Sequence, residues 1–245
     1  MPYLSRKAKE RIRKSEKKIL TGVIISTVVG FVLTCIAVST SYWIILKMRI
    51  PYYMNETNNY FISSHSGLWK YCLKSRNISR SKHSPKKPIQ EVCYYHPMFP
   101  SKEEIAENPR TDETSLHYSR AEGAFAVITI FIMAISHIFS IYTFKEPRFM
   151  FKRLAGFLYF LAAANCFVTI EMVISSHLYE EKHLPVAYPK LAIMHYGYSF
   201  YFTCLALSIY ILASITFLIY SHKRKEDKAL SDEEAIENRP MKIRR

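Results

Sequence analysis

The residues of this sequence that could carry chemistry do not form the patterns that catalysis needs. The 245 residues contain no glycine-rich phosphate-binding loop and no nucleophile motif. The nine histidines are scattered, and His65, His83 and His96 lack the spacing of zinc ligands. The sequence therefore predicts a protein that is not an enzyme and that holds no metal and no cofactor.

Two of the five cysteines could form a disulfide bond. Cys35, Cys166 and Cys204 fall in long apolar runs, where a cysteine usually serves as a small apolar side chain. Cys72 and Cys93 lie in a polar segment that charge counting places outside the cell, where disulfides form. A bond between them would stabilise the fold by about 3 kcal/mol in the chain-entropy model. Two free thiols, or a bond to another molecule, are the alternatives at this stage.

The same polar segment contains two N-glycosylation sequons, Asn55-Glu56-Thr57 and Asn77-Ile78-Ser79. Asn55 lies close to the end of the first apolar run, and a membrane surface so near hinders glycosylation. We therefore expect Asn77 to be the better acceptor of the two.

Four long apolar runs dominate the rest of the pattern. Apolar residues make up 49% of the chain, yet the mean hydropathy is only −0.03 because the charges are concentrated between the runs. About 20 apolar residues cross the hydrocarbon layer as a helix, which satisfies its own backbone groups. The first run is too long for a signal-peptide core, so we expect it to be retained. The predicted membrane spans are 19–46, 123–144, 154–176 and 193–220.

The basic residues predict the orientation of these spans. The chain has 34 Lys and Arg against 20 Asp and Glu, a net charge of +14. Segments 1–18 and 221–245 each carry eight Lys or Arg, and the short loop 145–153 carries four. Basic residues favour the cytoplasmic side, where they also attract anionic membrane lipids. We therefore predict a multi-pass plasma-membrane protein with both termini cytoplasmic, with 47–122 and 177–192 outside, and without a nucleic-acid partner.

Glu171 is the only acidic residue inside a predicted span. A charge near the centre of a membrane helix costs about 3 kcal/mol on insertion scales. Such residues face the bundle interior, a partner or water. The functional interpretation is an intramembrane contact with a partner channel. The alternatives are a hydrogen bond inside the bundle and a hydrated position near the outer boundary.

The segment around the two outer cysteines is rich in residues that favour β-strands. These stretches cover 60–62, 68–73 and 92–95. They predict a small antiparallel sheet that one disulfide staples, with the basic insert 75–88 projecting from it as a mobile loop.

Tryptophan and cysteine positions in this region carry a family resemblance. Trp43 is followed by Gly67-Leu68-Trp69, and then by Cys72 and Cys93. This pattern resembles the claudin and peripheral-myelin-protein superfamily. The resemblance implies an all-α membrane four-helix bundle with a small extracellular antiparallel β-sheet. In such a fold the motif tryptophan and the cysteines are structural.

A narrower resemblance opens the fourth apolar run. The segment Tyr196-Gly197-Tyr198-Ser199-Phe200 resembles the Tyr-Gly-Trp-Ser-Phe segment of voltage-gated calcium-channel gamma subunits and of stargazin-type receptor subunits, with Tyr198 in place of the usual Trp. The ending Met241–Arg245 lacks the PDZ-binding sequence of stargazin-type proteins. The resemblance implies a gamma-type auxiliary subunit that modulates gating or trafficking of a voltage-gated calcium channel or a related cation channel. Its partner would be a pore-forming channel or receptor subunit.

A claudin-type cell-junction or adhesion protein is the alternative. In that case the outer sheet would meet partners at cell–cell contacts, and the basic insert would favour anions or acidic partners. A membrane-organising protein of the peripheral-myelin type is a third possibility.

Overall fold

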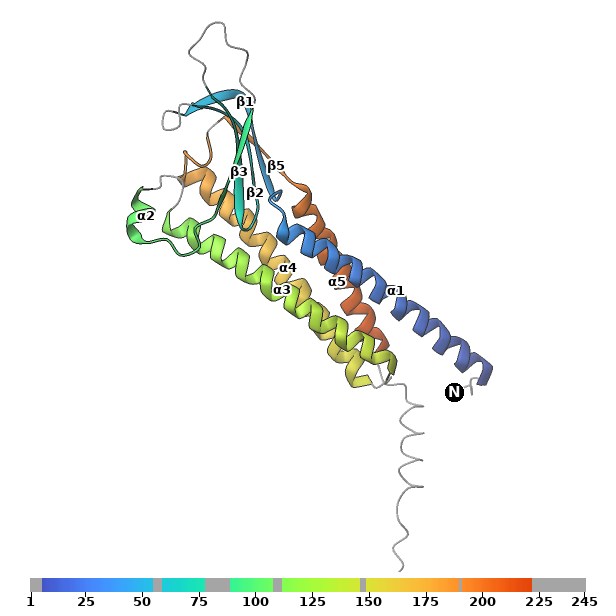
Figure 1. The fold of residues 1–245 in the computed structure, drawn as a ribbon. Coiled ribbons are helices and arrows are strands. Elements are labelled where there is room, and N and C mark those ends of the chain that lie inside the picture. Colours follow the sequence, from blue (N-terminus) through green and yellow to red (C-terminus); the bar gives the residue numbers. More distant parts are fainter. Residues whose placement is uncertain are drawn as a thin grey trace, which may run out of the picture.

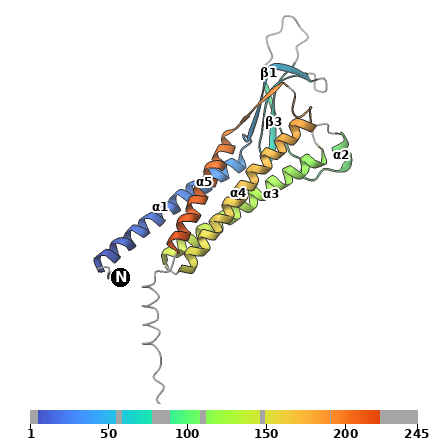
Figure 2. The same cartoon turned by 180° about the vertical axis from the view of Figure 1, so that it is seen from behind.

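The protein is described by a computed structural model that covers residues 6–54, 59–77, 89–107, 112–145, 149–189 and 191–221. Four long helices run alongside one another, and a small β-sheet stands at one end of them (Figure 1). We call this end of the bundle the sheet end. The N-terminus of the first helix lies at the opposite end, as the reverse view also shows (Figure 2).

The four long helices are each long and apolar enough to cross a membrane. In the bundle, α3 packs on α4, α4 on α5 and α5 on α1, with a smaller contact between α1 and α3. A short helix, α2 (Lys102–Glu107), precedes α3. The long helices are α1 (Arg6–Ser39), α3 (Glu113–Lys145), α4 (Phe149–His183) and α5 (Tyr198–Tyr220).

Large aromatic rings and small residues fill the middle of the bundle. Tyr159, Tyr210 and Phe217 are fully buried, and the Tyr159 ring lies 5.8 Å from the Tyr210 ring and 5.5 Å from the Phe217 ring. The Tyr159 hydroxyl accepts a hydrogen bond from Ser140 Oγ at 2.8 Å, and the Tyr210 hydroxyl donates to the Thr27 carbonyl at 3.1 Å. Alanines let the helices approach closely, as is usual between membrane helices. The buried ones are Ala155, Ala162, Ala163, Ala206 and Ala213.

The sheet has five antiparallel strands in the order β4-β3-β2-β1-β5. Cys72 on β3 lies directly opposite Cys93 on β4, and the two form the predicted intramolecular disulfide. β5 comes from the connection between α4 and α5, so it ties the last helix into the sheet. The strands are β1 (Ile44–Met54), β2 (Asn59–Ser66), β3 (Lys70–Asn77), β4 (Gln90–Tyr95) and β5 (Ala192–Tyr196). The predicted fold class, a membrane four-helix bundle with a small antiparallel sheet, is thereby confirmed.

Two ends of the predicted spans are strand rather than helix. α1 ends at Ser39, and the last residues of the predicted span 19–46 pair in β1. The predicted span 193–220 likewise begins in β5, and α5 starts only at Tyr198. The reason is that an uninterrupted apolar run does not distinguish a membrane helix from a buried strand that follows or precedes it.

The other two long helices extend beyond their predicted spans at the sheet end. α3 begins at Glu113, inside the predicted outer segment 47–122, and α4 continues to His183, inside the predicted loop 177–192. These helical extensions carry polar residues, which the search for apolar runs excluded. The sheet therefore packs against helix ends that are polar rather than apolar. Of the basic insert 75–88, residues 78–88 lie outside the described residues.

Replacing both disulfide cysteines, Cys72→Ser with Cys93→Ser, should destabilise the sheet. Loss of a closed loop with a sequence separation of 21 residues should cost about 3 kcal/mol. For a chain of this size that corresponds to a fall in melting temperature of roughly 10 °C in detergent. Cys35→Ser, which removes a free cysteine in α1, is the matched control. An unchanged melting temperature in the double variant would show that the staple does not stabilise the fold.

Candidate functional site

The C-terminal end of α1 is capped by both tryptophans of the chain. A helix leaves its last backbone carbonyls without partners inside the helix. Trp43 Nε1 donates a hydrogen bond to the Ala37 carbonyl at 2.7 Å, and Trp69 Nε1 donates to the Val38 carbonyl at 2.8 Å. The two indoles come from the start of the sheet and from the β2–β3 turn. They therefore join the helix bundle to the sheet at one point.

Two glycines allow the backbone to pass close to this helix end. A Cβ atom on Gly67 would lie 2.5 Å from Ser41 Cα, and one on Gly197 would lie 1.9 Å from the Tyr42 carbonyl oxygen. Gly197 N donates to the Trp43 carbonyl at 2.8 Å, and Trp43 N donates to the Ser66 carbonyl at 2.9 Å. The start of β1 is thus held on both sides by backbone hydrogen bonds that only glycine makes room for.

The remaining motif residues lie around the same point, which we call the junction. Leu68 and Phe200 are buried with Trp43 in one apolar cluster. Tyr196 stacks on Phe200 at 4.2 Å, and the Ser199 and Thr40 hydroxyls are hydrogen-bonded at 2.6 Å. Tyr198 stacks on Tyr42 at 5.1 Å. The structure therefore brings together the motif residues quoted from the sequence: Trp43, Gly67, Leu68, Trp69, Tyr196, Gly197, Tyr198, Ser199 and Phe200.

The two sequons cannot be placed in the same way. Asn55 lies outside the described residues, and so does the rest of the second sequon after Asn77, which is the last residue of β3. Glycosylation therefore stays a prediction.

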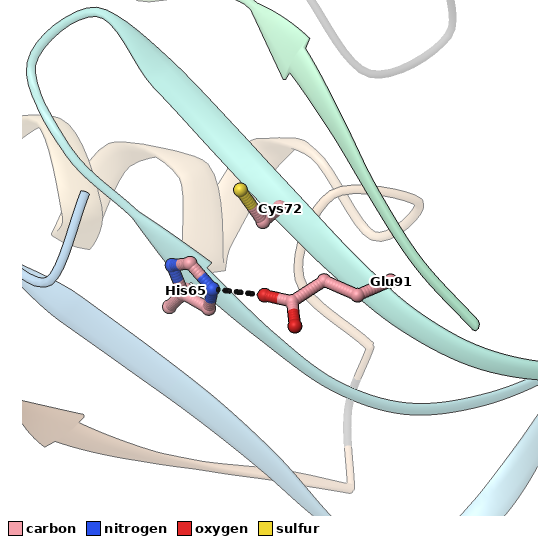
Figure 3. A group of neighbouring side chains, drawn as sticks. All are labelled: His65, Cys72 and Glu91. Carbon is pink, nitrogen blue, oxygen red and sulfur yellow. Dashed lines mark hydrogen bonds and ion pairs between the residues drawn. The ribbon is translucent and has the colours of Figure 1, made fainter. Parts of the chain in front are cut away.

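Three potential metal ligands meet on the sheet, but their chemistry does not suit a metal. The donor atoms of His65, Cys72 and Glu91 all lie within 4.8 Å of one another (Figure 3). A cysteine binds a metal as a thiolate, whereas the Cys72 sulfur is bonded to the Cys93 sulfur in a disulfide. Two ligands remain, and they are hydrogen-bonded to each other. The cluster is therefore better understood as a structural hydrogen bond beside the disulfide.

His65 connects this part of the sheet to the junction. Its Nδ1 lies 2.8 Å from the Ser41 carbonyl oxygen, and its Nε2 lies 2.7 Å from Glu91 Oε1. Lys74 Nζ lies 3.3 Å from the other carboxylate oxygen. The hydrogen bond from His65, with a smaller contribution from Lys74, holds the pKa of Glu91 below its ordinary value.

Glu171 lies on the outer surface of the bundle rather than inside it. Its side chain is exposed, and no hydrogen bond or ion pair joins it to another described residue. Phe157, Phe160 and Phe167 are also more than half exposed on α4. Together with Glu171 they recur at helical spacing and so share one face, which we call the α4 face. The bundle-internal hydrogen bond considered for Glu171 is therefore absent among the described residues.

Comparison with known proteins identifies the family. The sequence model of the PMP-22/EMP/MP20/Claudin tight junction family matches residues 28–219, which include the C-terminal third of α1, all of α3 and α4, and all of α5 except Tyr220. The chain belongs to this family. Members of the claudin family are structural or auxiliary proteins rather than enzymes, and the four membrane-length helices make this chain a multi-pass membrane protein.

Curated relatives within the claudin family are calcium-channel gamma subunits. The chain is 27% identical over 209 residues to the voltage-dependent calcium channel gamma-1 subunit of Sus scrofa. The aligned region covers 80% of this chain and 85% of the relative. The chain is 24% identical over 203 residues to the gamma-1 subunit of Bos taurus, with the same coverage. It is 25% identical over 175 residues to the gamma-7 subunit of Homo sapiens, covering 71% of this chain and 59% of the relative. The resemblance to claudins close to the gamma subunits is thereby confirmed.

At the junction, Gly197→Ala should destabilise this claudin-family fold. The added methyl group would overlap the Tyr42 carbonyl, and overpacking of this kind costs about 1–3 kcal/mol or more. We expect the melting temperature in detergent to fall by roughly 5 °C or more. Gly22→Ala is the control, because its Cβ would have nothing within 4 Å. Equal melting temperatures for the two variants would refute the close approach.

Glu91→Gln should change how stability depends on pH. A carboxyl group whose pKa is lowered in the folded state stabilises the fold above its unfolded pKa, and this stabilisation is lost as the pH falls through the folded pKa. The wild-type melting temperature should therefore fall toward that of Glu91→Gln as the pH drops below about 4.5. The difference at neutral pH should be small, about 1 kcal/mol or less, because the carboxylate is partly exposed. Glu103→Gln, on exposed α2, is the control, and parallel curves for wild type and Glu91→Gln would contradict the assignment.

Proposed function

We propose that this chain is a gamma-type auxiliary subunit that modulates gating or trafficking of a voltage-gated calcium channel or a related cation channel. The similarity to gamma-1 subunits supports this proposal, because it extends over 80% of the chain and 85% of the relative. The segment that carried the narrower resemblance, 196–200, forms part of the junction. Similarity over most of both chains is expected for two proteins that share a role as an auxiliary subunit.

The proposed orientation places the sheet outside the cell and the opposite end of the bundle in the cytoplasm. The disulfide of the sheet supports an oxidising outer compartment. The opposite end carries the basic residues, among them Lys152, whose Nζ lies 2.5 Å from Glu16 Oε1 and so ties α4 to α1. Positive charge at that end favours the cytoplasm. Asn77 would then lie on the side where glycans are attached.

The observation that carries the proposal is the exposed carboxylate on the α4 face. Glu171 is the only Asp, Glu, Lys or Arg between Arg153 and Glu180. It lies nine residues before Glu180, or roughly 14 Å along the helix, so it falls inside the hydrocarbon layer when that layer is centred on the apolar stretch. A lone acid that faces lipid there is costly. A helix of a partner subunit that offers a cation or a hydrogen-bond donor would remove this cost.

The three phenylalanines around Glu171 suit such a partner. Phe157, Phe160 and Phe167 present broad apolar area, and the acid in line with them would fix the register of the partner helix. A subunit bound in this way changes gating only if its affinity differs between two states of the channel. We therefore place the functional contact on the α4 face and the partner specificity on Glu171.

The claudin-type adhesion role remains the second candidate because of one surface. All six residues of the edge strand β4 are exposed, and Tyr94 and Tyr95 are 48% and 78% exposed. An exposed edge strand with apolar side chains is a typical contact surface for another protein. On the proposed outer side it could meet a neighbouring cell or the outer part of a channel.

Glu171→Leu should separate these two roles. In mild detergent, the tagged wild-type chain should retain a co-expressed pore-forming calcium-channel subunit, and the variant should retain at least about tenfold less, since an unpaired charge contact costs more than 1.4 kcal/mol. The isolated variant should be as stable as wild type, because leucine suits an apolar surface. Glu103→Leu, an acid removed from exposed α2, is the control. Full retention by Glu171→Leu would rule out the α4 face as the contact, and no retention by wild type would favour adhesion.

A further inference from the structure

A small acidic cavity lies between the sheet and the polar ends of α3 and α4. Its volume is about 50 Å³, and a second cavity of about 80 Å³ shares several of its walls. Figure 1 shows the sheet standing over these helix ends. The polar residues that line the cavity from the helices are Ser119, Glu122, Ser176, His177 and Glu180.

Glu122 lines this cavity with one carboxyl oxygen, the buried Oε1, that has no hydrogen-bond partner among the described residues. Glu122 is only 8% exposed. Glu180 enters the same cavity from α4, and its Oε1 accepts a hydrogen bond from Ser115 Oγ at 3.2 Å. The two carboxyl groups come from different helices that are packed against each other. Their convergence is thus a product of the fold rather than of sequence spacing.

No positive side chain offsets these two acids. Neither cavity is lined by Lys or Arg in the described part of the chain. Arg120 is close in sequence, but its Nε donates to the Met98 carbonyl at 2.7 Å and its guanidinium lies over Phe99. Burial lowers the pKa of His96, which lines both cavities, so this ring adds no charge at neutral pH. A buried carboxylate without a counter-charge costs several kcal/mol.

We propose that this acidic cavity binds a divalent cation of the calcium type. Two carboxylates match its charge, and the hydroxyls of Ser115, Ser119 and Ser176 are further hard oxygen donors of the kind that Ca²⁺ prefers. The cavity has room for about three to five water-sized groups, which allows an ion with a few waters to complete the coordination. The proposed orientation places the cavity on the extracellular side of the membrane, where the calcium of the extracellular fluid can reach it. The affinity should be of order 10⁻⁴–10⁻³ M, as in extracellular modules.

The site would add a link between the polar ends of α3 and α4. An ion held by Glu122 on α3 and Glu180 on α4 would join the two helix ends beneath the sheet, next to the junction residues Trp43, Gly67 and Leu68 that also line the cavity. Binding of Ca²⁺ to the folded state alone raises stability by mass action. This proposal is independent of the proposed channel partner, because the isolated chain should bind the ion.

Two measurements on the purified full chain in detergent at pH 7.4 test the site. Tb³⁺ should show sensitised luminescence through Trp43 or Tyr188, which line the cavity, and Ca²⁺ should displace it. Raising Ca²⁺ from below 0.1 mM to 10 mM at constant ionic strength should raise the melting temperature by roughly 3–6 °C. Mg²⁺, which demands a tighter octahedral geometry, should raise it less.

Glu122→Gln should abolish both effects, because it removes one of the two charges and keeps the shape of the side chain. Glu180→Gln is the second variant, should the first fail to fold. Glu103→Gln, on exposed α2, should leave both effects unchanged. The proposal is overturned if wild type shows no luminescence that Ca²⁺ displaces, or if Glu122→Gln responds to Ca²⁺ as wild type does. A wild-type melting temperature that rises as the pH is lowered, without any effect of Ca²⁺, would also overturn the proposal. It would show that protons neutralise the two acids.

Discussion

The end of α1 is the point on which the arrangement of the sheet and the bundle depends. The helix ends at Ser39, and the chain enters β1 at Ile44. The carbonyls that the helix leaves unpaired would be costly next to lipid. The indoles of Trp43 and Trp69 satisfy two of them, and the backbones at Gly67 and Gly197 fit closely against the same turn. The hydrogen-bond needs of one helix end thereby select tryptophan and glycine at positions far apart in the sequence.

The second constraint is that an acidic side chain needs a partner where the dielectric constant is low. The chain provides different partners for the acids in different parts of the fold. At the end opposite the sheet, Glu16 and Lys152 form an ion pair with both side chains largely buried. On the sheet, Glu91 is held by His65 and Lys74. Glu171, Glu122 and Glu180 have no counter-charge among the described residues. Because Glu171 faces outward and the other two acids line a cavity, they indicate two different kinds of missing partner, a protein helix and an ion.

The sequence was sufficient for the features that depend on residue type and on local runs. Four apolar runs predicted four membrane-length helices, and two cysteines in one polar segment predicted the disulfide. The edges of these elements were not predictable in the same way, because the first three residues of β1 and most residues of β5 continue the apolar runs of the helices they adjoin. Glu122 is the last residue of the predicted outer segment 47–122. Its burial depends on the sheet folding back over α3 and on Glu180, 58 residues later, and no local pattern contains that information.

One helix, α4, carries residues of both proposed sites. Glu171 lies on the outward face of α4, and Ser176, His177 and Glu180 lie one to three turns later on the side that lines the cavity. A rigid helix cannot shift at one of these places without shifting at the other. If the channel partner and the ion each bind two positions of α4 with different affinity, each changes the affinity of the other by the same factor, since such coupling is reciprocal. Extracellular calcium would then act on the channel through its auxiliary subunit, and the polar end of α4 would be the element that transmits the effect.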